Sequence, residues 1–261
     1  SLADTSLDII ASLVTLYGVR LAARPADADH RFGHGKAEAL AALFQTGLII
    51  ASAVAIAWRG MSRLGGSEAP DNPELGIAVS LAAMAATLVL VIYQRSVVRR
   101  TGSVAIHADH VHYSSDLLLN ASVIAAFVLD SILGLRGADP FFGVAISLWL
   151  VWHARQIAGS AIDQLMDREW PDEKRSRLVA VVSMHPDICG VHDVRTRTSG
   201  SYDFAQIGVW VDPSITVVEA HRILTGLRTR LIAEFPGTEV VLHADPASAP
   251  RTVAAADASS L

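Results

Sequence analysis

Two pairs of residues in this chain have the types and the spacing to bind a divalent metal ion. Asp4 and Asp8 are four residues apart, and so are His112 and Asp116. On a helix, that spacing places both members of a pair on the same face. Together the pairs offer three carboxylates and one imidazole, a set of four ligands that matches the tetrahedral geometry preferred by zinc. Because the set contains no soft sulfur, Cd2+ and Fe2+ are also possible ions.

The segments that carry these pairs are predicted to cross a membrane. Residues 39–58 and 75–94 contain no charged side chain, and each run has about the length that a helix needs to span a bilayer. Three more apolar segments, at about 2–22, 104–134 and 139–161, carry a few polar residues at helical spacing. A soluble core could contain one such segment but not five in succession. The sequence therefore predicts a polytopic α-helical membrane domain with five spans.

Ionisable residues inside a membrane are functional candidates, because an aspartate at the centre of a bilayer costs roughly 2.5–3.5 kcal/mol on insertion scales. Three carboxylates and an imidazole on two spans can offset that cost by converging on one cation. The alternative is that both pairs lie near helix ends and are solvated. Asp109 and His110, about one turn before His112, are expected near the cytoplasmic mouth of the span, within reach of water.

Basic residues predict the orientation of the chain. They are frequent after the first, third and fifth spans and sparser in the opposite loops, which places the C-terminal part in the cytoplasm. The net charge of −5 gives no basic surface for nucleic acid. Cys189 is the only cysteine, so the chain has no disulfide framework and no thiolate cluster for metal, as expected for a domain in a reducing compartment.

From Pro171 the sequence has the character of a soluble domain. Its patterns predict a helix over 172–184, strands over 191–198 and 204–211, a helix over 215–235 and a last strand over 240–243. This α-β-β-α-β order is typical of a small α+β sandwich. The expected organisation is a transmembrane domain at 1–165, a cytoplasmic domain at 166–247 and a disordered tail at 248–261.

Two further groups of side chains outside the membrane could bind metal. The first cytoplasmic loop contains an aspartate and two histidines that could converge, although a solvated polar loop would have the same composition. The cytoplasmic domain has histidines at the start of a strand, on a helix face and after the last strand, where they could meet. These candidates are Asp27, His30 and His34 in the loop, and His192, His221, His243 and Asp245 in the domain.

A metal site inside a membrane could serve transport only if it can release the bound ion. Protonation of a ligand can cause this release. An imidazole has a reference pKa of about 6.5. His112 could therefore exchange its metal for a proton when it faces a more acidic exterior. This chemistry predicts antiport of metal against protons.

Several motifs together resemble the cation diffusion facilitator family, and specifically its FieF-type bacterial zinc and iron efflux transporters. The resemblance covers residues 1 to about 248. The motifs that carry it are Asp4-Thr5-Ser6-Leu7-Asp8, His30-Arg31-Phe32-Gly33-His34-Gly35-Lys36-Ala37-Glu38, His112-Tyr113-Ser114-Ser115-Asp116, His192-Asp193-Val194-Arg195-Thr196-Arg197 and His243-Ala244-Asp245-Pro246.

The resemblance implies a homodimer in the bacterial inner membrane that exchanges Zn2+ for protons, with a metallochaperone-like cytoplasmic domain. It also implies six membrane helices, of which the first is absent from this chain. The metal ligands it implies are the four membrane residues, the three loop residues and the four residues of the cytoplasmic domain named above. Lys36 and Asp167 match a charged pair that interlocks the helices at the dimer interface.

One position departs from the pattern of the family. Where close relatives have Gln-Ile-His on the second strand, this chain has Gln206-Ile207-Gly208. The cytoplasmic site therefore lacks one histidine, and we expect weaker binding there, of one ion in place of two. The four predicted membrane ligands, Asp4, Asp8, His112 and Asp116, are all present.

Three other functions are less consistent with the sequence. An intramembrane metalloprotease would need a His-Glu-x-x-His motif, which the chain lacks, and an open coordination position for water. A metal-sensing scaffold would not be expected to lose a cytoplasmic ligand while it keeps all four membrane ligands. A channel would need weak or multiple binding sites, whereas four close ligands favour a carrier.

Overall fold

The computed structural model describes residues 2–63, 73–133 and 138–247, which form two compact units with the main boundary between Met166 and Asp167. Each unit has its own hydrophobic core. The predicted tail at 248–261 lies outside the described residues. The first unit is helical, and the second contains a three-stranded sheet with two helices.

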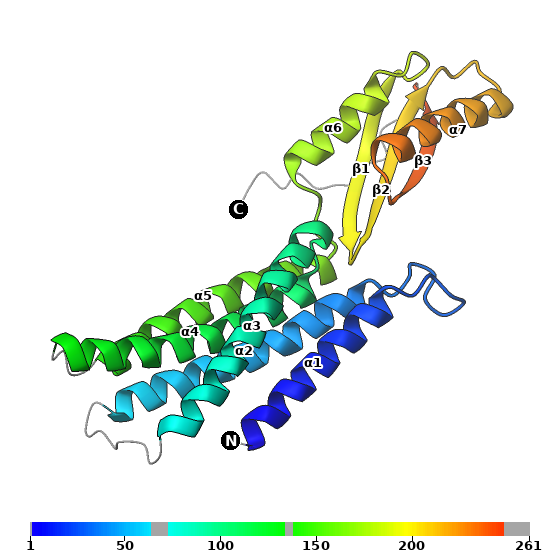
Figure 1. Ribbon diagram of the computed structural model, residues 1–261. Helices are drawn as coiled ribbons and strands as arrows, with labels where there is room; N and C mark the ends of the chain where they lie inside the picture. Colours follow the sequence, from blue (N-terminus) through cyan, green and yellow to red (C-terminus); the bar gives the residue numbers. More distant parts are fainter. Residues whose placement is uncertain (1, 64–72, 134–137, 248–261) are drawn as a thin grey trace. The chain divides into compact units, whose positions relative to one another are not determined.

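Five long helices build the first unit. They are α1 (Leu2–Ala22), α2 (Lys36–Arg63), α3 (Pro73–Thr101), α4 (Val104–Leu133) and α5 (Ala138–Leu165), and Figure 1 shows them lying alongside one another. Helix α2 packs against α1, α4 and α5, and α4 also contacts α1 and α3. Each of the five predicted spans is therefore a helix, although most of the helices extend beyond the apolar runs that predicted them.

Small residues allow these helices to approach closely. The core contains Ala39 and Ala42 from α2, Ala105 and Ala108 from α4, and Ala154 from α5, all almost fully buried. Helices α1 and α2 approach closely at Gly18, where an added Cβ would lie 2.4 Å from the Cβ of Ala41. Small residues at helix contacts are common in membrane domains, where packing and not water exclusion drives helix association.

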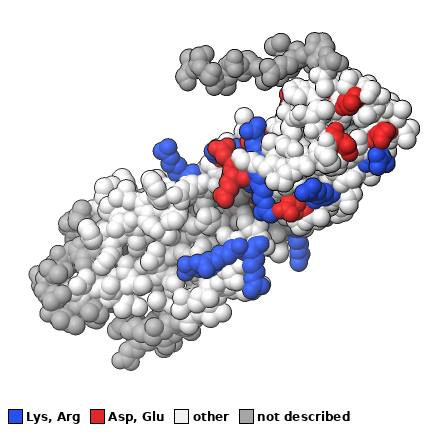
Figure 2. Space-filling model, turned by 90° about the horizontal axis from the view of Figure 1, so that it is seen from above, with Lys and Arg blue, Asp and Glu red and all other residues white. Residues whose placement is uncertain are grey.

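The outer surface of the helical unit is largely apolar. Large apolar side chains such as Val54, Trp58, Val89 and Trp152 are more than half exposed. On the face drawn in Figure 2, broad areas of this unit have no charged side chains, whereas Lys, Arg, Asp and Glu are spread over the second unit. By length and hydropathy, two stretches of the described residues, Lys36–Trp58 and Phe141–Leu165, are long and apolar enough to cross a membrane.

The second unit has the predicted α-β-β-α-β order. Its elements are α6 (Asp172–Ser183), β1 (Gly190–Ser199), β2 (Tyr202–Val211), α7 (Val217–Glu234) and β3 (Thr238–Pro246). The sheet has the order β1-β2-β3, with β2 parallel to β3, and Figure 1 shows α6 and α7 beside it. The side chains of Leu178, Val182, Leu227 and Leu231 from the two helices are fully buried in its core.

Alternation along β2 separates the two faces of the sheet. Ala205, Ile207 and Val209 belong to the core, so the intervening residues face the other way. The register pairs Gly208 with His243 and Trp210 with Asp245. These four residues therefore share the face away from the core. The last strand was predicted to end at His243, but it continues to Pro246, so Asp245 lies within β3 and not after it.

Candidate metal centres

In the helical unit, the structure brings one predicted ligand from each pair into contact. His112 Nε2 on α4 lies 3.1 Å from Asp8 Oδ1 on α1. His112 is buried and Asp8 is half-buried, so the contact lies largely inside the unit. Next to it, the hydroxyl groups of Ser12 and Tyr113 are 2.8 Å apart and link the same two helices. Helices α1 and α4 are thus held together at the contact that joins the two predicted pairs.

The other two members of the predicted quartet extend this contact. Asp116 lies one turn after His112 on α4, is partly buried, and interacts electrostatically with His112 and Asp8. Asp4 lies in α1, one turn before Asp8, but its side chain is outside the part that the structure describes. That all four residues bind one ion stays a prediction.

The contact uses one of the two ring nitrogens of His112. Nδ1 is buried and has no hydrogen-bond partner among the described residues, whereas Nε2 faces the carboxylate. A protonated Nε2 donates a hydrogen bond to Asp8, and a deprotonated Nε2 offers a lone pair that can bind a metal ion. The same atom can therefore hold either a proton or a metal.

Asp109 differs from the sequence-based expectation. We expected it at a wet cytoplasmic mouth, but its side chain is buried between three helices. Its Oδ2 accepts a hydrogen bond from Gln94 Nε2 on α3 at 2.7 Å, and its Oδ1 accepts one from Gln45 Nε2 on α2 at 3.4 Å. The expectation that water reaches Asp109 was wrong, because nothing in the sequence around Asp109 shows that glutamines from two other helices would cover it.

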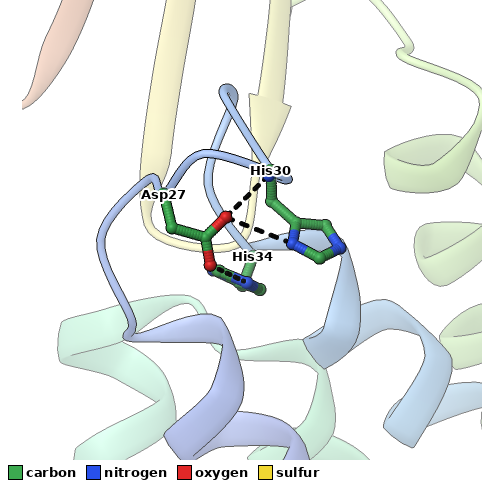
Figure 3. Close-up of side chains that lie close together, drawn as sticks. All are labelled: Asp27, His30 and His34. Carbon is green, nitrogen blue, oxygen red and sulfur yellow. Dashed lines mark hydrogen bonds and ion pairs between the residues drawn. The ribbon is translucent and has the colours of Figure 1, made fainter.

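The loop between α1 and α2 brings its three predicted ligands together (Figure 3). Asp27 lies 3.3 Å from His30 through Oδ1 and 3.3 Å from His34 through Oδ2. One ligand atom from each of the three residues lies within 4.8 Å of the others, and the two imidazole rings have centroids 4.5 Å apart. This distance is short enough for a single ion to bind all three side chains after a small adjustment.

The conformation of this loop is set by hydrogen bonds to its own backbone. Asp27 Oδ1 accepts bonds from the N–H groups of Asp29 and His30, an arrangement that favours a turn. Gly33 adopts a φ of 76°, which a residue without Cβ takes at little cost. The backbone N–H of His30 stabilises the ionised form of Asp27 and holds the pKa of this carboxyl below its ordinary value.

In the second unit, three of the four predicted ligands converge on the outer face of the sheet. Asp245 lies 3.2 Å from His192 through one oxygen and 3.2 Å from His243 through the other. The ring of His192 also stacks on Trp210, with centroids 4.8 Å apart. His221 is exposed on α7, and no contact among the described residues joins it to the other three.

Gly208 lies directly beneath the ring of His192. A Cβ added at this position would lie 2.4 Å from His192 Cε1 and 2.8 Å from Nε2. No other residue type leaves this space to the imidazole, because all others have a Cβ. Glycine at position 208 removes a predicted ligand, but it also allows His192 to lie against Asp245.

The charged pair that the resemblance implied has other contacts within the chain. Lys36 Nζ donates a hydrogen bond to the carbonyl oxygen of Leu165 at 3.1 Å. Asp167 Oδ1 accepts one from Arg197 at 3.1 Å, and Asp167 itself has a positive φ of 56°. An interlock of Lys36 with Asp167 at a dimer interface stays a prediction.

Known proteins match both units. The family model described as the cation efflux transmembrane domain matches residues 2–166, and the one described as the cytoplasmic domain of cation efflux proteins matches 170–247. The curated relatives include the cation-efflux pump FieF of Yersinia pestis (strain Pestoides F), which is 40% identical over 95% of this chain and 82% of its own length. The protein of the same name from Cronobacter sakazakii is 41% identical over the same shares. Among solved structures, the metal-bound C-terminal domain of the CzcD transporter from Thermotoga maritima is 24% identical, with a TM-score of 0.29 over 30% of this chain and 93% of that chain.

Proposed function

The chain belongs to the cation efflux family, so it is a transporter and not an enzyme, and we propose that it exports a divalent metal ion from the cytoplasm in exchange for protons. The observation that supports this exchange best is the contact of His112 Nε2 with Asp8 Oδ1 at 3.1 Å. It places one titratable nitrogen beside one carboxylate in a largely buried position.

The proposed exchange follows from competition for this nitrogen. When the site is open to the cytoplasm, a neutral His112 and the carboxylates of Asp8 and Asp116 bind the metal, with Asp4 as the fourth ligand. When the site is open to a more acidic exterior, His112 takes up a proton. An imidazolium cannot bind a metal ion, and it donates a hydrogen bond to Asp8, so the metal leaves. The two states thus alternate between a bound metal and a bound proton.

Zinc is the metal that we propose as the main substrate, because four nitrogen and oxygen ligands suit its tetrahedral geometry. The absence of sulfur from the set leaves Cd2+ and Fe2+ as further substrates. We place the protein as a homodimer in a bacterial inner membrane, with the second unit in the cytoplasm. Two further sites bind metal on the cytoplasmic side, from which it is exported. They are the loop site of Asp27, His30 and His34 and the sheet site of His192, His243 and Asp245.

Transport by the reconstituted protein tests this function. Proteoliposomes should accumulate Zn2+ when a pH gradient is imposed, and protons should move in the opposite direction. Asp116→Ala should abolish both fluxes, because it removes a carboxylate beside His112 and Asp8. Asn120→Ala is the matched control, since Asn120 is an exposed polar residue one turn later on the same helix. Transport that persists in Asp116→Ala, or that is indifferent to the gradient in the native protein, would refute the proposal.

A further inference from the structure

Asp109 is an ionisable residue buried in the helical unit, one turn before the proposed transport site. The side chain of Asp109 is only 8% exposed and lies between Gln45 of α2 and Gln94 of α3. Both glutamines are at least as well buried, at 0% and 6%. Three helices thus contribute one polar side chain each to a cluster that water hardly reaches.

The hydrogen bonds of this cluster are incomplete. Each glutamine donates from Nε2 to the Asp109 carboxylate, but Oε1 of Gln45 and Oε1 of Gln94 are buried without a hydrogen-bond partner in the described part of the chain. A buried polar atom without a partner is costly, and so is a buried carboxylate whose neighbours are neutral. The cluster therefore has a surplus of acceptors and a net negative charge, and what it lacks is a proton or a cation.

A proton fits this cluster better than a divalent metal. Transition metals take several strong ligands, whereas the cluster offers one carboxylate and two neutral amide oxygens. A proton needs a single carboxylate oxygen. The amide groups suit both states of the carboxyl, since a glutamine presents either its N–H2 or, after a half-turn, its C=O. Ionised Asp109 accepts a hydrogen bond from each of the two amides, as in the structure. Protonated Asp109 would donate a hydrogen bond to one of the amide oxygens that have no partner in this structure.

We propose that Asp109, held by Gln45 and Gln94, is a second proton-binding residue of the transporter, between His112 and the cytoplasmic end of α4. This inference rests on the proton exchange proposed above. Among the residues that the structure describes, the titratable groups that interact electrostatically with Asp109 are His112 and Tyr113, both on its own helix. Helices α2 and α3 turn the neutral Gln45 and Gln94 towards it.

The position of Asp109 suits a proton on its way to the cytoplasm. It precedes His112 by three residues, or about 4.5 Å along the axis of α4. Helix α4 begins at Val104, after the turn that the basic residues place in the cytoplasm. When the site is open to the acidic exterior, the Asp109 carboxylate takes up a proton of its own and becomes a carboxylic acid. When metal binds at His112 in the state open to the cytoplasm, Asp109 releases this proton to cytoplasmic water. Asp109 returns to its ionised form, so protons and charges balance over one cycle.

Asp109→Asn tests the inference in proteoliposomes that report Zn2+ uptake and proton flux together. The variant keeps an amide that can bond both glutamines but binds no proton. We expect Zn2+ still to bind, and the number of protons moved per metal ion to fall by about one. Glu38→Gln is the matched control, because Glu38 is equally buried, at 7%, but lies in the first turn of α2, where the helix terminus favours the ionised carboxylate. It should leave the ratio unchanged.

An unchanged ratio in Asp109→Asn, or an equal fall in both variants, would overturn the inference. A native protein that carries Zn2+ with no proton flux would instead refute the proposed exchange, so the two failures are distinguishable. If Asp109→Asn does not fold, Gln94→Leu provides the test. Infrared difference spectra on Zn2+ binding are then compared between the native dimer and this variant. Loss of one partner should shift the carbonyl band of a protonated carboxyl, and an identical band in both proteins would overturn the inference.

Discussion

At the scale of single residues, Gly208 shows that a missing side chain can give its space to a neighbouring one. The sequence identifies it as the loss of a histidine ligand. In the structure, the ring of His192 occupies the space above Gly208, stacks on Trp210 and reaches Asp245. We therefore expect the sheet site to bind a single ion through His192, His243 and Asp245.

Gly208→Ala should displace His192, because the new Cβ would lie 2.4 Å from its ring. We expect the affinity of the second unit for Zn2+ to fall about 10-fold to 100-fold, as when a metal ligand loses its orientation. Calorimetric titration of the unit checks this. Gly226→Ala on α7 is the control, since an added Cβ there meets nothing within 4 Å. Undiminished affinity in Gly208→Ala, or two tightly bound ions in the native unit, would show that the expectation is wrong.

Two substitutions can separate the structural role of Asp27 in its loop from its proposed role as a metal ligand. Asp27→Asn keeps an oxygen that accepts from the N–H groups of Asp29 and His30 but removes the negative charge, whereas Asp27→Ala removes both. We expect both variants to lose metal binding and only Asp27→Ala to lose the turn. Amide chemical shifts of Asp29 and His30 distinguish these outcomes. A variant Asp27→Asn that binds metal like the native protein would contradict the role of the carboxylate as a ligand.

The same turn gives a pH dependence with a definite sign. Because the backbone N–H of His30 lowers the pKa of Asp27 from its ordinary value of 3.8, the stabilisation by this carboxylate is fully present above 3.8. It is lost as the pH falls through the lower pKa of the folded loop. The amide shifts of Asp29 and His30 should therefore titrate with a midpoint below 3.8, and the titration should vanish in Asp27→Asn. A midpoint above 3.8 would contradict this assignment.

At the scale of elements, close packing of α1 on α2 determines where Asp8 lies. Helix α1 carries Asp8 and Gly18, and Gly18 meets Ala41 of α2 with no room for a side chain. A shift of α1 away from α2 would move its whole length, including the residue that contacts His112. The geometry of the proposed transport site therefore depends on a small residue almost three turns away.

Gly18→Ala should destabilise the helical unit by about 1–3 kcal/mol, as expected for overpacking at a tight contact. Gly18→Ala combined with Ala41→Gly should recover much of this loss, because the second change restores the space between the helices. Thermal unfolding in detergent measures both variants. Gly47→Ala on α2 serves as the control, as a Cβ at this position has nothing within 4 Å. Equal destabilisation by Gly18→Ala with and without Ala41→Gly would argue against the contact.

At the scale of the whole molecule, the two units have separate cores of different character. The helical core is rich in alanine and is surrounded by exposed large apolar side chains, as suits a lipid environment. The core of the second unit is rich in leucine, isoleucine and valine from two helices and a sheet, and it also contains Trp170 and Phe235. Each unit can therefore be stabilised or destabilised without direct change to the core of the other.

Residues 167–247 alone should fold, and Leu227→Ala should destabilise them by about 2–5 kcal/mol, since Leu227 is fully buried in their core. Chemical unfolding of the isolated unit measures this loss. The same substitution in the full chain should leave Zn2+ binding at Asp8, His112 and Asp116 unchanged. Ile232→Ala, on the same helix but exposed, is the control. Reduced Zn2+ binding at these three residues in Leu227→Ala would show that the units depend on each other.

The sequence by itself determined the family, the two kinds of domain and the order of their elements. Apolar runs of bilayer length and strand alternation are local patterns, and the motifs predicted to bind metal are contiguous in the sequence. All of them can therefore be recognised without the tertiary structure. The contact of Asp8 with His112 across 104 residues stayed a hypothesis until the packing of α1 on α4 was known. Only the tertiary structure decided that Asp109 is buried by Gln45 and Gln94, and that Gly208 gives its space to His192. Both results depend on side chains from separate elements, and the sequence records no distances between such side chains.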